Sequence, residues 1–234
     1  MYSVTSNTIA NTYLLLVDKV MSRGEMILDE RGDKIKELLN VVSVIKEPLK
    51  NNFYNIPDAE VDIPKGFPFG KNELAIYRKQ FLDPDKRGFV YTYGERLCHY
   101  KHQSTSFFGD KVTYVNQIDE IIKKLNNNNY TRRATAITWS PYLDNSNDNV
   151  PCLITLDAKI RDNKLNMTIL YRSHDALLGW FPNIYGLAYV GKHIIENVKQ
   201  PITMGPMTVH SISAHIRDTD LPLANNILKQ NVYK

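Results

Sequence analysis

The sequence has few cysteines and no long apolar segment. Its 2 Cys, Cys98 and Cys152, exclude a disulfide framework, and no Cys or His spacing in it is typical of a zinc site. No apolar run approaches the roughly 18 residues that a membrane-spanning helix needs. The first residues, MYSVTSNTIAN, lack the basic and apolar regions of a signal peptide. We therefore expect a cytoplasmic protein with no metal and no membrane partner.

Neither sign of charge is in large excess. The formal net charge is +4 and the basic residues form no stripe, so nucleic acid is not an expected partner, whereas a small anionic substrate suits the mildly basic balance. The 43% of apolar and 23% of charged residues are ordinary for a globular protein. A chain of 234 residues suits one domain with a sizeable core, which we expect to span residues 1–234.

Hydrophobic periodicity predicts a mixture of helices and strands. The predicted helices cover residues 8–21, 72–81, 115–125 and 177–198, with a last helix beginning at Pro222. The predicted strands cover residues 38–45, 88–93, 133–139, 153–160, 165–171 and 208–216, and residues 26–34, 48–68 and 141–150 are predicted loops. Because the two kinds of element alternate irregularly around a central hairpin, an α+β fold is favoured over a doubly wound sheet.

The most informative stretch is residues 151–183, PCLITLDAKIRDNKLNMTILYRSHDALLGWFPN. Two alternating segments are joined by Arg-Asp-Asn-Lys at 161–164, and an Asp-Asn pair favours a tight hairpin turn. The hairpin returns the chain to its start, so Arg172, Ser173 and Asp175 are predicted to lie near Cys152. A thiol, a guanidinium, a hydroxyl and a carboxylate in one pocket are typical of an enzyme.

Cys152 has two interpretations. A lone cysteine in an apolar strand is more often a small buried hydrophobic residue than a nucleophile. A nearby cation stabilises a thiolate, however, and the predicted hairpin places Arg172 where it can do so. Cys98 has no such neighbour in the pattern and is predicted to be structural.

The same stretch resembles the thymidylate synthase family. The resemblance lies in a Cys after Pro, an Arg-Ser-x-Asp motif, a Gly four residues later and an Asn four after that. It covers most of the chain and is closest to the short archaeal type. The matching positions are Pro151-Cys152, Arg172-Ser173-His174-Asp175, Gly179, Asn183, Tyr93-Gly94, Asn116-Gln117-Ile118, Arg132-Arg133 and Ala214-His215-Ile216.

The resemblance implies a mixed sheet with flanking helices, a homodimer formed through one sheet face, and a methyltransferase acting on C5 of dUMP. The one-carbon unit and hydride would come from 5,10-methylenetetrahydrofolate or from methylene-tetrahydromethanopterin. In this interpretation Cys152 adds to C6 of the uracil ring, and Glu73 manages protons through ordered water. Tyr93 helps to remove the C5 proton, and Asp175 binds the pterin.

The remaining implied roles concern the nucleotide. Its phosphate would be held by Arg172 and Ser173 of one subunit and by Arg132 and Arg133 of the partner subunit. Arg31 of an N-terminal loop would add a further contact, with Arg23 as the alternative. Forked guanidinium groups suit phosphate oxygens. His215 would contact the sugar. Asn183 can donate to uracil O4 and accept from N3–H, whereas related dCMP hydroxymethylases have Asp here. Asn183 therefore favours dUMP over dCMP.

Structural alternatives remain for several of these residues. Paired arginines are commonly solvated, Asn183 could cap a turn, Glu73 suits a helix start, and a strand His such as His215 is commonly a core residue.

The chain also departs from the family pattern at several positions. Leu153 stands where His usually follows the Cys, Tyr171 replaces a Gln, Arg217 replaces a Tyr, and residues 230–234 do not match the segment that closes over substrate. Without that closing segment water could replace hydride, which leaves a pyrimidine nucleotide 5-hydroxymethyltransferase as one alternative. A non-catalytic RNA-binding relative is another.

Overall fold

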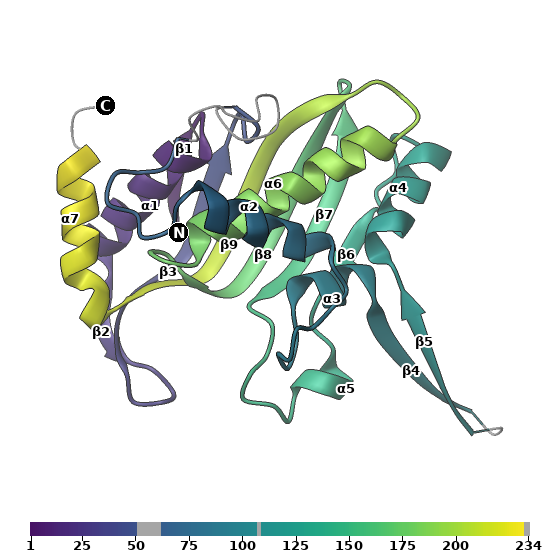
Figure 1. Ribbon diagram of the computed structural model, residues 1–234, viewed down its shortest axis with the longest axis horizontal. Helices are drawn as coiled ribbons and strands as arrows, with labels where there is room; N and C mark the ends of the chain where they lie inside the picture. The colour runs from purple at the N-terminus through teal and green to yellow at the C-terminus, as the bar shows by residue number, and fades with distance from the viewer. Residues whose placement is uncertain (51–61, 107–108, 232–234) are drawn as a thin grey trace.

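A mixed seven-stranded sheet forms the centre of the computed structural model, which describes residues 1–50, 62–106 and 109–231 (Figure 1). The strand order is β1-β3-β9-β8-β7-β6, and β2 pairs with β3 off this path. The pairs β1–β3 and β8–β9 are parallel and the others are antiparallel. The strands are β1 (Tyr2–Ser6), β2 (Glu25–Leu28), β3 (Lys34–Ile45), β6 (Thr135–Ile137), β7 (Leu153–Arg161), β8 (Lys164–Asp175) and β9 (Thr203–Arg217).

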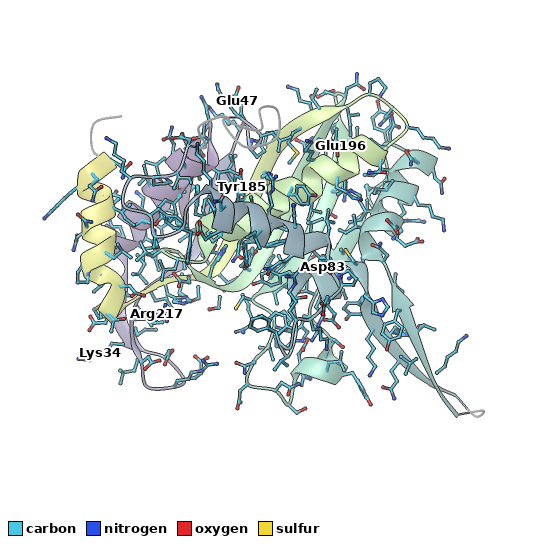
Figure 2. The ribbon with its side chains drawn as sticks, viewed as in Figure 1. Lys34, Glu47, Asp83, Tyr185, Glu196 and Arg217 are labelled. Carbon is cyan, nitrogen blue, oxygen red and sulfur yellow. The ribbon has the colours of Figure 1, made fainter. Side chains whose placement is uncertain are left out.

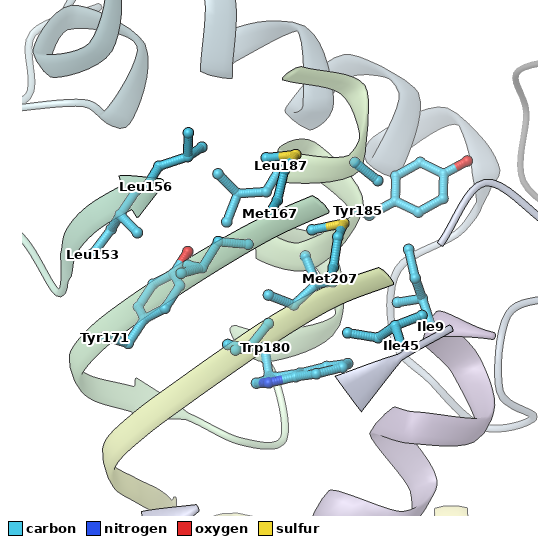
Figure 3. Packing of buried hydrophobic residues seen from close by; sticks show 14 of the residues in the cluster. Ile9, Ile45, Leu153, Leu156, Met167, Tyr171, Trp180, Tyr185, Leu187 and Met207 are labelled. Carbon is cyan, nitrogen blue, oxygen red and sulfur yellow. The ribbon is translucent and has the colours of Figure 1, made fainter. Parts of the chain in front are cut away.

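Helices cover one face of this sheet, which confirms the α+β class. The long helix α6 (Trp180–Asn197) crosses the middle of the sheet, and α1 (Ile9–Arg23) packs beside it through Tyr13, whose ring lies 5.5 Å from that of Phe181. Figure 3 shows Met167 and Met207 of the sheet packed below α6, with Trp180 at the helix start. The other helices are α2 (Lys71–Lys79), α3 (Tyr93–Cys98), α4 (Gln117–Asn127), α5 (Pro141–Asp144) and α7 (Leu221–Asn231), with short 3-10 turns at Gln80–Leu82 and Asp218–Asp220.

The predicted hairpin is confirmed as β7 and β8. Its register runs from Arg161 opposite Lys164 to Leu153 opposite Tyr171. Asp162 and Asn163 have φ of 50° and 55°, the left-handed pair that a two-residue hairpin turn requires. The local sequence at the turn therefore sets the register that brings the two ends of the hairpin together.

Four neighbouring strands share a one-residue offset in their alternation between faces. Side chains of a regular strand alternate, so buried positions should be two residues apart. In β8 they are Leu165, Met167, Ile169 and Tyr171 and then His174, a step of three; β3, β7 and β9 contain such a step too. The offsets meet in one row of paired residues, Val41, Ser211, Tyr171 and Leu153. Cys152 lies immediately beyond this row.

The predicted strand at residues 88–93 is wrong. Arg87 and Gly88 have φ of 50° and 82°, which breaks an extended run, and Thr92 instead caps helix α3, its Oγ1 accepting from Glu95 N at 3.0 Å. Strand β2 (Glu25–Leu28) overlaps the predicted loop 26–34, because its four residues pair with β3 at the edge of the sheet. Helix α5 lies within the predicted loop 141–150. Of the predicted loop 48–68, residues 51–61 lie outside the described part.

Besides β2, three further strands were not predicted from the sequence. β1 forms the edge of the main sheet, and β4 (Tyr100–Ser106) and β5 (Gly109–Val115) pair only with each other in a ribbon that extends away from the body (Figure 1). The ribbon sequence has little apolar alternation because it does not cover the core. No helix within the described ranges is long and apolar enough to cross a membrane.

Candidate active site

Cys152 lies just before β7, held by the strand that returns beside it. The backbone N–H of Arg172 donates to Cys152 O at 2.9 Å. The Arg172 guanidinium donates from Nε to Pro151 O at 2.9 Å and from Nη2 to Val150 O at 3.0 Å, and Nη2 lies 3.8 Å from the Cys152 Sγ. One side chain therefore fixes the loop that delivers the thiol and places a positive charge beside the sulfur.

Burial and charge act in opposite directions on this thiol. Burial raises the pKa of Cys152, and Arg172 opposes that rise. Glu30 raises the same pKa, Arg31 lowers it and Asp175 raises it, in that order. The charge of Arg172 thus makes the thiolate easier to form in a site that otherwise disfavours it.

Replacing Arg172 by Ala is expected to slow alkylation of Cys152 by iodoacetamide by about three- to tenfold at neutral pH, because only the thiolate reacts. The guanidinium lowers the thiol pKa, so its removal raises that pKa and moves the midpoint of the pH–rate curve to higher pH. Arg161→Ala, at the other end of the hairpin, is the control. An unchanged midpoint in Arg172→Ala would contradict the assigned electrostatic role.

Four phenols surround the thiol: Tyr77, Tyr91, Tyr93 and Tyr171. Burial raises the pKa of each, that of Tyr91 to about 12, and the nearby Cys152 contributes to every rise. Tyr93 packs edge-on against Tyr171, with centroids 6.2 Å apart. The phenols therefore remain protonated at neutral pH and can each donate a hydrogen bond.

An aromatic pocket opens beside these phenols. Its volume is about 460 Å³, and Tyr77, Tyr91 and Tyr93 line it together with Phe81, Phe89 and Val90. A pocket of this size with aromatic walls fits a planar heterocycle. The apolar side chains of Phe89 and Val90 are 67% and 56% exposed, so the pocket has an open apolar rim.

Asn183 is brought to the same place by the first turn of α6. Its Oδ1 accepts a hydrogen bond from the Tyr77 hydroxyl at 2.8 Å, and its Nδ2 lies 3.3 Å from His174 Nε2. Only 8% of Asn183 is exposed. A carboxamide held this firmly can read the edge of one base rather than adapt to several.

Asp175, Ser173 and His215 lie at the end of β8 and on the neighbouring β9. Asp175 pairs with His215 in the sheet register, and its Oδ1 accepts from the backbone N–H groups of Leu177 and Leu178 at 3.0 and 2.9 Å. That oxygen shapes the turn before α6, while Oδ2 lies 4.0 Å from Arg217 Nη2. Figure 2 labels Arg217 at this end of the sheet, close to Lys34.

His215 and the N-terminal loop complete this side of the site. The buried Nδ1 of His215 has no hydrogen-bond partner among the described residues. Arg31 lies in the turn between β2 and β3, where Asp29 Oδ1 accepts from its backbone N–H at 2.9 Å. The charge of Arg31 lowers the pKa of the Cys152 thiol.

Three predicted residues do not join the site within one chain. Glu73 is exposed, and its Oε2 accepts from Gly70 N at 3.0 Å as part of the α2 start. Arg132 and Arg133 line a separate pocket of about 510 Å³ with Lys124 and Tyr130. Ala158 N donates to Ala134 O at 2.9 Å, so the arginines lie about 20 Å along the strands from Cys152.

Sequence reasoning missed Tyr77, Tyr91 and the contacts of His174. Tyr77 stands four residues after Glu73 on helix α2, so the helical period could have placed both side chains on one face. Tyr91 precedes Tyr93 by two residues.

A buried ion pair between Arg96 and Asp144 was also missed. Arg96 Nη2 lies 2.7 Å from Asp144 Oδ1, and the two positions are 48 apart in the sequence, so no local pattern indicates their contact.

The backbone at Gly94 packs too closely against residues 80–83 to allow any side chain there. A Cβ at this position would meet the backbone oxygens of Gln80 and Asp83 well under 3.0 Å away. Gly94→Ala is therefore expected to push α3 from the 3-10 turn and to destabilise the fold by about 2–3 kcal/mol. Thermal unfolding should show a drop in Tm of about 5–10 °C. A Tm equal to that of the wild type would show that the close approach is not retained in solution.

Residues 65–234 match the family model described as thymidylate synthase. The chain belongs to the thymidylate synthase family.

Relatives match nearly the whole chain. A protein of Methanothermobacter thermautotrophicus is 42% identical over 233 residues, covering 97% of this chain and 99% of its own. One of Methanothermobacter marburgensis is 40% identical over 233 residues, covering 97% and 98%, and one of Methanococcoides burtonii is 34% identical over 227 residues, covering 97% and 94%. All three carry the name "Putative thymidylate synthase".

Proposed function

We propose that this chain, folded as one domain over residues 1–234, is a thymidylate synthase that methylates C5 of dUMP to give dTMP. The observation that carries the proposal is the Cys152 Sγ placed 3.8 Å from Arg172 Nη2, beside a pocket whose Tyr77 holds Asn183. A soft, charge-stabilised sulfur suits conjugate addition to a pyrimidine, and a fixed carboxamide suits recognition of uracil.

The chain's own groups account for the activation of the base. The Cys152 thiolate adds to C6 and makes C5 a nucleophilic enolate carbon, while Arg172 stabilises the thiolate before attack and on its departure. Asn183 donates to O4 and accepts from N3–H, which fixes the ring over the sulfur. Tyr93, which burial keeps as the neutral phenol, would assist removal of the C5 proton. Glu73 would act through water.

The reduced pterin, 5,10-methylenetetrahydrofolate or methylene-tetrahydromethanopterin, supplies the one-carbon unit and the hydride. The aromatic pocket at Tyr77, Tyr91 and Phe89 fits its planar ring, and Asp175 Oδ2, the oxygen that does not hold the turn before α6, would accept from its N–H groups.

A homodimer completes the phosphate site in this proposal. Arg31, Arg172 and Ser173 act from one subunit with His215 at the sugar, and Arg132 and Arg133 reach in from the partner. The sheet face opposite the helices supports a dimer, because it leaves Leu39, Ile137 and Ile212 exposed by 53%, 45% and 38%. About 20 Å separates Cys152 from the arginine pair within one chain, so a partner is the natural source of the pair.

The test is an activity assay with dUMP and with dCMP, each paired with both pterin types. Hydrogen carried from the labelled pterin into a product methyl group supports the proposal, and a 5-hydroxymethyl product would replace it with the water-capture reaction. Incubation with 5-fluoro-dUMP and the methylene pterin should give a mass adduct on Cys152. No adduct together with salt-sensitive RNA binding would point to a non-catalytic relative.

A further inference from the structure

A chain of buried hydrogen bonds extends from Asn183 into the sheet. Its Nδ2 lies 3.3 Å from His174 Nε2, and His174 Nδ1 lies 3.1 Å from the Ser211 hydroxyl. His174 is 2% exposed and Ser211 is fully buried. The imidazole also stacks on Tyr171, with ring centroids 3.7 Å apart and planes inclined by 13°. The histidine ring is therefore clamped on its face and at both nitrogens.

The proton positions in this chain follow from the chemistry of its members. Because Tyr77 donates to Asn183 Oδ1, the carboxamide directs Nδ2 at His174 Nε2; a hydrogen bond there requires the ring proton on Nδ1, from which it donates to Ser211. Burial, followed by the neighbouring His215, lowers the pKa of His174 well below its usual value, which keeps the ring neutral. Tyr77 donates to Asn183 Oδ1 at 2.8 Å from the other side. The carboxamide thus has one defined orientation.

That orientation decides which base fits. Uracil offers an acceptor at O4 and a donor at N3–H, whereas cytosine offers a donor at N4 and an acceptor at N3. The free N–H and lone pair of a carboxamide match uracil in one orientation and cytosine after a rotation of half a turn. With the His174 proton on Nδ1, such a rotation would turn Asn183 Oδ1 toward the Nε2 lone pair, and two acceptors would meet in a buried site. Only a move of that proton to Nε2, with Ser211 reversing its hydrogen bond to Nδ1, would relieve the contact.

Resting on the function proposed above, we propose that His174 is a positioning residue that sets the choice of uracil over cytosine by holding the Asn183 carboxamide in one orientation. The Arg-Ser-x-Asp motif gives roles to Ser173 and Asp175 on either side of His174 but none to His174 itself, which is its variable position. The hydrogen-bond chain from Tyr77 to Ser211 supplies one. The expected substrates are 2′-deoxyribonucleotides whose base is a uracil with a free N3–H donor.

The test measures binding of dUMP and of dCMP by titration calorimetry to the full-length protein. His174→Phe keeps a flat ring against Tyr171 but removes the acceptor, and the dUMP-to-dCMP affinity ratio should fall by about tenfold or more. His174→Gln can again offer an acceptor, its Oε1, and should restore most of the ratio. His193→Phe makes the same change on α6, where His193 contacts Asn197, and should leave the ratio unchanged.

The outcomes separate this inference from the proposed function. A wild-type protein that binds neither nucleotide would refute the function itself. Wild-type selectivity retained in a folded His174→Phe variant would overturn only the role of His174. If that variant does not fold, ¹⁵N NMR of the wild-type imidazole decides: a neutral ring protonated on Nδ1 supports the proposal, and a proton on Nε2 overturns it.

Discussion

Turnover of dUMP should fall by at least about 10³-fold when Cys152 is replaced by Ser, while dUMP binding should change little. The serine hydroxyl is far less acidic than a thiol and is a poor nucleophile toward a conjugated pyrimidine, and the smaller oxygen causes no clash. In the proposed site, affinity for dUMP depends instead on Asn183 and the arginines. The variant should be followed by product formation, by calorimetric binding of dUMP and by the mass of the 5-fluoro-dUMP adduct.

Cys98→Ser is the matched control for this experiment. Burial raises the pKa of Cys98 to about 12, its thiol lies 3.9 Å from Phe81 O, and it lies outside the proposed site. This variant should keep its turnover and its adduct. If Cys152→Ser keeps the adduct or Cys98→Ser loses it, the nucleophile has been assigned to the wrong sulfur.

Asp144→Ala is expected to destabilise the protein by about 3–5 kcal/mol, because it removes the two-pronged partner of the buried Arg96 and leaves only Glu95, whose Oε2 lies 3.2 Å from Arg96 Nε, to balance its charge. Arg96 and Asp144 are 4% and 2% exposed, and they form a two-pronged contact of 2.7 and 3.1 Å. Arg96 also donates to Thr138 O at 3.0 Å, and Asp144 accepts from Ser140 N at 2.7 Å. In thermal unfolding the Tm should fall by about 10 °C or more.

Two further variants define the cause of that loss. Asp148→Ala removes an exposed carboxylate from the same segment and should leave the Tm close to that of the wild type. Arg96→Met combined with Asp144→Leu removes both charges and leaves Glu95 paired with Lys86 at 3.7 Å, so it should recover part of the lost stability. A single Asp144→Ala variant as stable as Asp148→Ala would show that the ion pair contributes nothing to the fold.

Arg96 and Arg172 together explain how the loop before Cys152 is held. Arg96 and Asp144 fix residues 138–144, and Arg172 binds the carbonyls of Val150 and Pro151. We therefore expect Asp144→Ala to lower activity as well as stability, at temperatures where the variant is still folded.

The sequence predicted those helices and strands that are determined by residues close to one another in the chain. The Asp162-Asn163 turn set the hairpin, the apolar spacing of residues 115–125 gave helix α4, and Asn116 caps that helix by accepting from Ile118 and Asp119 N. The strand predicted at residues 88–93 was wrong because its aromatic residues line a pocket rather than a sheet. Edge strands such as β1 could not be predicted because their pairing depends on distant residues.

The same distinction applies to the candidate site. The hairpin was enough to predict that Arg172 would lie near Cys152, and the structure places them in contact. It was not enough to find Tyr77, since the contact between Tyr77 and Asn183 joins two helices 106 positions apart. The roles of Glu73, Arg132 and Arg133 stay predictions, because they depend on water or on a second subunit.

The shared step in β3, β7, β8 and β9 has a consequence for sequence change. Deleting one residue from a single strand on either side of that step would turn the following side chains of that strand from helix-facing to outward-facing, while its neighbours kept their direction. The row of Val41, Ser211, Tyr171 and Leu153 would then no longer line up. Cys152 and His174, which lie beyond this row, would lose their present positions relative to each other. Length changes in this protein should therefore be tolerated in the β4–β5 ribbon and the loops, and rejected within these four strands.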